Sequence, residues 1–84
     1  MKRIFIHELK LGDCIKVVGT IDRWKGYWWI GRVSLLKSLI PEIECIDTND
    51  VEKIESDDRK IKVGILKSDR LYLLTKDECM IHSL

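Results

Sequence analysis

The stretch that most constrains the fold runs from Thr20 to Val33 and contains all three tryptophans of the chain. Lys25-Gly26 lies at its centre, and glycine adopts a positive φ without a Cβ clash, so a turn is predicted there. Residues of high β propensity flank the pair on both sides. The pattern predicts a β-hairpin with a two-residue loop. In this register Trp24 faces Tyr27 and Ile21 faces Ile30.

Because side chains alternate across a strand, this register divides the hairpin into two faces. The apolar face is predicted to be the core face, with Trp28 buried. It comprises Ile15, Val17, Ile21, Trp28, Ile30 and Leu36. The other face mixes aromatic and charged residues, and Trp24 or Trp29 is expected to stay exposed on it. It comprises Val18, Asp22, Trp24, Tyr27, Trp29 and Val33.

The remainder of the chain also favours strands. Twelve isoleucines and no alanine among 84 residues indicate a β-rich composition, and this length suits a single domain over residues 1–84. Besides the hairpin arms Cys14–Trp24 and Tyr27–Lys37, strands are predicted at Lys2–His7, Glu42–Asp47, Lys60–Leu66, Leu71–Thr75 and Cys79–His82. Ser68-Asp69 is predicted to form a second hairpin turn. Asp50–Ser56 suits a short helix or a further strand.

The segment Leu11-Gly12-Asp13-Cys14-Ile15-Lys16-Val17-Val18-Gly19-Thr20-Ile21 resembles the first strand of oligonucleotide-binding (OB-fold) domains. In these domains a Gly-Asp turn opens a long strand that bends at a central glycine. The resemblance implies a small barrel of five to six strands, possessing at most one short helix; an SH3-like barrel is the alternative. It also implies a ligand lying across the second and third strands, between the first and last hairpin loops.

Charge segregation supports a binding role. Residues 1–41 carry eight Lys/Arg and three acids, residues 42–58 one Lys and eight acids, and residues 59–84 six Lys/Arg and three acids. Aromatic and basic residues together could stack bases and neutralise phosphates, which predicts a single-stranded nucleic-acid interface. The candidate residues are Arg23, Trp24, Lys25, Tyr27, Trp29, Arg32, Lys67 and Arg70. A protein-interaction module, as a subunit, inhibitor or homodimer using the aromatic face and the acidic segment, is the alternative.

No motif for catalysis, a cofactor or a metal is present, so a non-enzymatic protein is expected. Cys14, Cys45 and Cys79 are odd in number and widely spaced, which favours buried thiols over disulfides or a zinc site. His7 and His82 are expected to be structural. The acidic segment lacks the spacing of a calcium loop. With no apolar run of roughly 18 residues and no signal-peptide pattern, no membrane association and a cytoplasmic location are expected.

Overall fold

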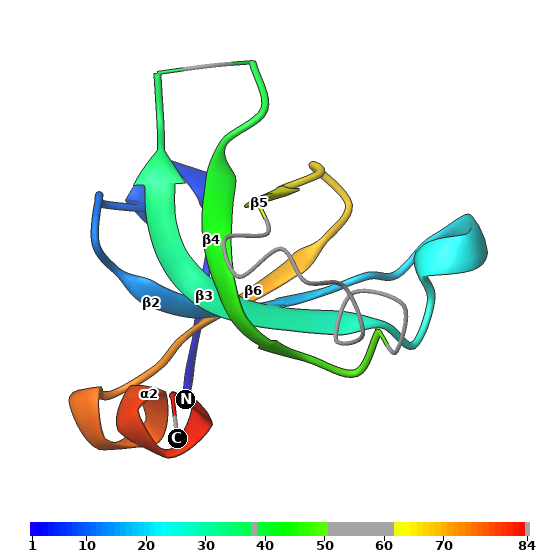
Figure 1. Ribbon diagram of the computed structural model, residues 1–84. Helices are drawn as coiled ribbons and strands as arrows, with labels where there is room; N and C mark the ends of the chain where they lie inside the picture. The colour runs from blue at the N-terminus through cyan, green and yellow to red at the C-terminus, as the bar shows by residue number, and fades with distance from the viewer. Residues whose placement is uncertain (38, 51–61, 84) are drawn as a thin grey trace.

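A computed structural model describes residues 1–37, 39–50 and 62–83, which form an antiparallel β-sheet and a short C-terminal helix (Figure 1). The mainly β prediction is therefore confirmed. The strands are β1 (Lys2–Ile4), β2 (Cys14–Val18), β3 (Trp28–Leu35), β4 (Glu42–Thr48), β5 (Lys62–Gly64) and β6 (Arg70–Leu73). The helices are the 3-10 turns η1 (Ile6–Glu8) and η2 (Asp22–Trp24) and the α-helix α2 (Lys76–His82).

The sheet has the order β1-β6-β2-β3-β4-β5 and, over the described residues, it does not close into a barrel. Strands β2 to β5 follow one another as a meander, and β6 returns to pair with β2 and β1. The predicted hairpin between Lys60–Leu66 and Leu71–Thr75 is wrong, because β5 pairs with β4 instead of β6. Both strands send alternate apolar side chains to the core, and this pattern does not specify the neighbouring strand. A short helix or a further strand is predicted for Asp50–Ser56. From residue 51 onward, this segment lies outside the residues that the structure describes.

The hairpin between β2 and β3 differs from its prediction in register. Gly26 has a φ of 90°, and the Tyr27 amide donates to the Trp24 carbonyl at 3.0 Å, so the turn at Lys25-Gly26 is confirmed. The strand before it ends at Val18, however, and Val18 pairs with Trp28. Gly19 packs against the backbone of Trp24, where a Cβ would overlap the carbonyl oxygen. The chain between them therefore forms η2, and not the predicted strand through Trp24.

This shift reverses the expected roles of two adjacent tryptophans. Val17 pairs with Trp29 and with Leu71, and all three belong to the main core cluster. Trp29 is only 5% exposed. Trp28 points to the opposite face, where it is half-buried. The predicted burial of Trp28 as the core tryptophan is thus wrong. The observed pairing is offset from the predicted one by five positions (paired numbers sum to 46 instead of 51), and an odd offset exchanges the two faces of a strand.

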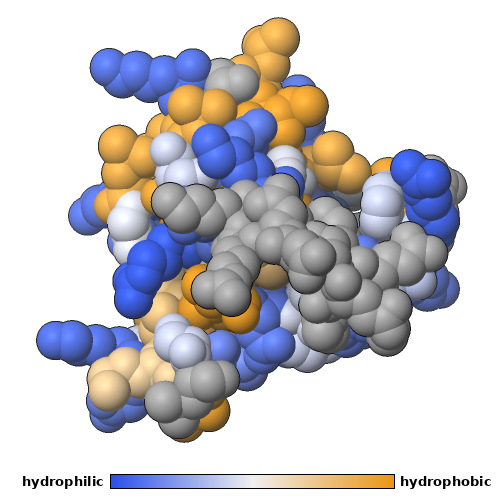
Figure 2. Space-filling view, in the orientation of Figure 1, coloured by the Kyte–Doolittle hydropathy of each residue, from blue (hydrophilic) through white to orange (hydrophobic). Residues whose placement is uncertain are grey.

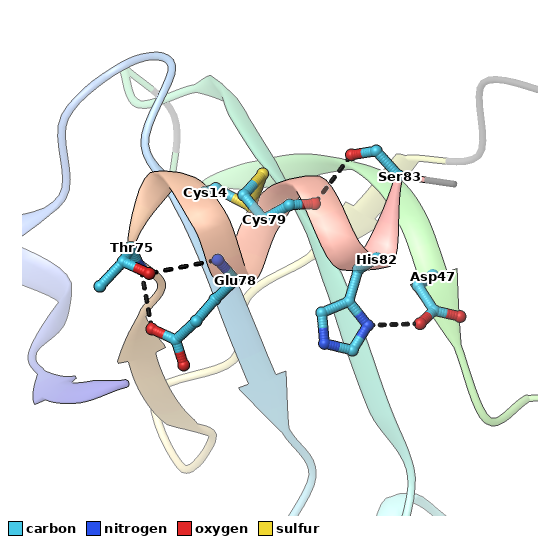
Figure 3. The surroundings of a disulfide bond; sticks show 7 residues. All are labelled: Cys14, Asp47, Thr75, Glu78, Cys79, His82 and Ser83. Carbon is cyan, nitrogen blue, oxygen red and sulfur yellow. Dashed lines mark hydrogen bonds and ion pairs between the residues drawn. A yellow bond between two sulfur atoms is a disulfide. The ribbon is translucent and has the colours of Figure 1, made fainter.

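We call the side of the sheet that carries Ile15, Val17 and Trp29 the core face, and the opposite side the helix face. On the helix face, α2 packs over a second apolar cluster at the ends of β2 and β3. Cys79 of α2 forms a disulfide with Cys14 of β2 (Figure 3). The expectation of unpaired thiols is therefore wrong for these two cysteines. Spacing along the sequence conceals their proximity, because 65 positions separate them.

The predicted strand Cys79–His82 is also wrong, since these residues belong to α2. Thr75 caps the helix: its hydroxyl accepts from the Glu78 amide at 3.2 Å, and the Glu78 carboxylate accepts from the Thr75 amide at 2.9 Å (Figure 3). This capping box is visible in the sequence as Thr75-Lys76-Asp77-Glu78. At the other end of α2, His82 Nδ1 lies 2.7 Å from Asp47 Oδ2 of β4.

Candidate nucleic-acid interface

The aromatic residues of the predicted site form a cluster in which the rings pack mainly against one another. The Trp24 ring packs edge-on against Trp29 at a centroid distance of 5.8 Å and against Tyr27 at 6.3 Å. Tyr27 stacks on Trp29 with an angle of 16° between the ring planes. Since Trp29 is only 5% exposed, little of its ring is open to a base. Trp24, half-buried, and Tyr27, 37% exposed, are the two members of this cluster that solvent reaches.

The basic residues of the predicted site divide between several surfaces. The Arg23 guanidinium lies 4.5 Å from the Trp24 ring centroid, and Lys25 is exposed at the adjoining turn. Arg32, in contrast, alternates with Gly31 and Val33 and lies on the helix face, between its partners Cys14 and Glu44. It does not join the aromatic cluster.

The first and last predicted loops are adjacent. Thr20 Oγ1 donates to the Ser68 carbonyl at 2.6 Å, which ties the loop after β2 to the turn before β6. In that turn, the Asp69 amide donates to the Leu66 carbonyl at 3.1 Å, and Asp69 Oδ2 accepts from the Leu66 amide at 2.9 Å. Lys67 is exposed on this turn and Arg70 is exposed at the start of β6.

A second aromatic and basic surface lies on the helix face, and of its residues only Arg70 is predicted from the sequence. Arg3 pairs across the sheet with Tyr72, Tyr72 with Lys16, and Val18 with Arg70 and Trp28. The Arg3 guanidinium lies 5.9 Å from the ring centroid of Tyr72 and 5.4 Å from that of Phe5. Lys16 Nζ lies 5.0 Å from the ring centroid of Trp28. We call Arg3, Phe5, Lys16, Trp28, Arg70 and Tyr72 the basic patch.

Charge is separated by strand. The four neighbouring strands β1, β6, β2 and β3 contain no Asp or Glu. Their charged residues are Lys2, Arg3, Lys16, Arg32 and Arg70. The next strand, β4, carries Glu42, Glu44 and Asp47 and no Lys or Arg. The absence of acids from four segments is visible in the sequence, but that these segments are neighbours follows from the sheet order.

Two hollows adjoin these surfaces. A groove of about 610 Å³ runs between β1 and the Leu66–Asp69 turn, and its lining includes Arg3, Phe5, His7, Lys67 and Arg70. A smaller pocket of about 270 Å³ opens on the core side, beside the aromatic cluster. Its lining comprises Trp24, Trp29, Ile40, Lys62, Val63, Gly64, Leu66 and Asp69.

Among the residues that the structure describes, two carboxyl groups have shifted pKa values. Burial raises the pKa of Asp69 above its ordinary value, and the hydrogen bond from the Leu66 amide opposes this rise. The hydrogen bond from the Thr75 amide lowers the pKa of Glu78, and the N-terminal ammonium, 3.0 Å away, acts in the same direction. In the part of the chain that the structure describes, no three His, Cys, Asp or Glu side chains gather in a way that could hold a metal ion. No helix of that part is long and apolar enough to span a membrane.

Comparison with protein-family models, curated proteins and solved structures finds no match to this chain.

Proposed function

We propose that this chain is a non-enzymatic binding module for single-stranded nucleic acid, and that the nucleic acid lies across the basic patch. The observation that carries this proposal is the block of four neighbouring strands with five cations and no carboxylate. The chain as a whole has a formal net charge of only +1, so the positive charge is concentrated locally. Four of the five cations, Arg3, Lys16, Arg32 and Arg70, lie on the helix face, while Lys2 pairs with Leu73 and lies on the core face. A local field of this kind attracts a polyanion although the molecule is nearly neutral.

The patch combines both types of contact that single strands use. Arg3, Lys16 and Arg70 supply cations for phosphates, while Phe5, Tyr72 and Trp28 supply rings for bases. Phe5 is 55% exposed, and Tyr72 and Trp28 are half-buried, so each ring has accessible surface. Stacking on such rings contributes roughly 1–3 kcal/mol per base, and every base has a face that can stack.

The groove beside β1 extends the patch toward the predicted loops. It brings Lys67 and Arg70, two of the predicted residues, next to Arg3 and Phe5. A single-stranded nucleic acid that leaves the helix face through this groove would reach Arg23, Trp24, Lys25 and Tyr27. The sheet is open, but its strand order bears on the choice between the two predicted topologies: β6 pairs with β2, the first strand of the meander, and not with its chain neighbour β5. This favours the SH3-like alternative over the OB-like one.

The test is a titration of a fluorescently labelled, mixed-sequence oligonucleotide at two salt concentrations. The wild type should bind at low salt and weaken steeply as salt rises. Arg3→Ala and Lys16→Ala should each reduce the slope of log K against log[salt] by about 0.7, since each removes one phosphate contact. Tyr72→Ala should weaken binding by roughly 1–3 kcal/mol with little change in slope. Lys10→Ala, an exposed cation outside the patch, is the matched control.

A protein partner is the alternative function, and one observation favours it. Leu35, Leu39 and Ile40 are 38%, 101% and 48% exposed at the end of the molecule where β3 leads into β4. Figure 2 shows hydrophobic surface gathered at this end. Exposed apolar groups of this kind suit a protein contact. If no oligonucleotide binds at low salt and the chain sediments as a dimer that Leu39→Asp dissociates, the protein-interaction function is correct.

A further inference from the structure

We infer that the 270 Å³ pocket beside the aromatic cluster receives one unstacked base, and that Asp69 selects bases with an exocyclic amino group. This inference rests on the proposed function, because it assigns specificity to the same nucleic-acid interaction. The pocket lies next to the groove through which we route the strand: Asp69 lines both hollows. A base leaving the strand at the Leu66–Asp69 turn therefore has the pocket directly beside it.

The walls and size of the pocket suit a flat ring. Trp24 and Trp29 form one side, and the aliphatic groups of Ile40, Val63 and Leu66 contribute much of the rest. Trp24 is half-buried and lines the pocket, so part of its ring is accessible from it. An apolar cavity of about 150 Å³ is enough to bind benzene, so about 270 Å³ accommodates the ring of a base. Contact with an indole ring is the interaction by which proteins hold bases out of their stack.

Asp69 supplies the polar contact that would distinguish one base from another. Its Oδ2 accepts from the Leu66 amide, which fixes the carboxylate on its turn. Among the described residues, Oδ1 has no hydrogen-bond or ion-pair partner. A partly desolvated carboxylate with an unused acceptor favours a ligand N–H and disfavours a carbonyl oxygen. Cytosine and adenine present an amino group where thymine and uracil present a carbonyl, as in the pairing of Asp with the cytosine amino group.

The experiment uses three oligonucleotides, each of ten identical deoxynucleotides: dC10 of cytidine, dA10 of adenosine and dT10 of thymidine. It compares their binding to wild type and to Asp69→Asn. The wild type should prefer dC10 and dA10 over dT10 by about tenfold, the ratio expected for one hydrogen bond to a charged acceptor. Asparagine can still accept from the Leu66 amide through its oxygen, and its NH₂ group then faces the pocket as a donor. Asp69→Asn should therefore reverse the preference toward dT10. Lys10→Ala should keep the wild-type order.

A second measurement uses mononucleotides, whose quenching of tryptophan fluorescence reports the pocket directly. Cytidine monophosphate should quench more strongly than uridine monophosphate, and Trp24→Phe should reduce that quenching. Equal binding of the three oligonucleotides, with no change of order in Asp69→Asn, would overturn the inference and leave the proposed function standing. If no oligonucleotide binds, the proposed function fails; the inference fails with it unless cytidine monophosphate still quenches selectively.

Discussion

At the scale of single residues, Trp28 and Trp29 illustrate what alternation can and cannot determine. The sequence shows that one of two adjacent tryptophans must face the core and the other must not. It does not show which, because that choice depends on the register of β2 against β3. The register is linked to the close contact of Gly19 with the Trp24 backbone. With the chain folded back in this way, Asp22–Trp24 forms η2 and is not part of the hairpin strands. Contacts of this type depend on a backbone path that propensity and periodicity do not specify.

Truncation of the two tryptophans should therefore have unequal effects. Trp29→Ala should lower the free energy of unfolding by roughly 3–5 kcal/mol, because it empties a large, buried volume in the main core cluster. Trp28→Ala should cost less, since Trp28 is only half-buried. Urea denaturation of both variants measures the difference. A larger loss for Trp28→Ala would contradict the assigned faces.

Glu78 should make stability depend on pH in the acid range. Its pKa in the folded protein lies below the ordinary value of 4.5, so the folded state favours the carboxylate. The stabilisation is fully present above pH 4.5 and is lost as pH falls through the lower folded pKa. Thermal melts of wild type and Glu78→Gln should differ at pH 6 and converge toward pH 2. A constant difference across this range would show that the Glu78 charge does not stabilise α2.

At the scale of elements, strands with distinctive local patterns were predictable and their partners were not. The predicted strand Glu42–Asp47 matches β4, and the turn at Lys25-Gly26 is present as expected. The predicted pairing of β5 with β6 is wrong because both strands have similar apolar faces. The sequence alone permits β5 to pair with either β4 or β6. The helix α2 was missed although Thr75 and Glu78 signal its start. In Cys79–His82 the run of three apolar residues, which also suits a strand, competes with that capping signal, and the disulfide and packing over Trp28 favour the helix.

The disulfide should hold α2 to the sheet. It closes a long loop, with Cys14 and Cys79 separated by 65 positions, and such bonds typically contribute about 2–5 kcal/mol. Dithiothreitol should lower the melting temperature of the wild type, and Cys14→Ser/Cys79→Ser should already show the lowered value. The double variant, insensitive to the reductant, is the control for other effects of dithiothreitol. Equal melting temperatures with and without reductant would show that the bond adds no stability.

At the scale of the whole molecule, the structure changes which residues make up the candidate site, but the site still combines aromatic and basic side chains. Sequence reasoning grouped aromatic and basic residues by their closeness along the chain, which placed Trp29 and Arg32 on one surface. The sheet order instead assembles Arg3, Lys16, Arg70 and Tyr72 from three separate segments. Grouping of this kind requires the topology. The cytoplasmic location stays a prediction. The Cys14–Cys79 disulfide is unusual for a cytoplasmic protein, since such bonds persist mainly in oxidising compartments or in hyperthermophilic cells.

The sheet order predicts a specific pattern of amide hydrogen exchange across the molecule. The amides of β2 should exchange most slowly, because β2 lies between β3 and β6 and its residues Ile15 and Val17 have no exposed surface. The amides of β1 and β5 should exchange faster, since each of these short strands forms an edge with one neighbour. Exchange followed by NMR at individual amides measures this order. If the β5 amides proved as slow as those of β2, β5 would have a second paired neighbour and the open sheet would be incorrect.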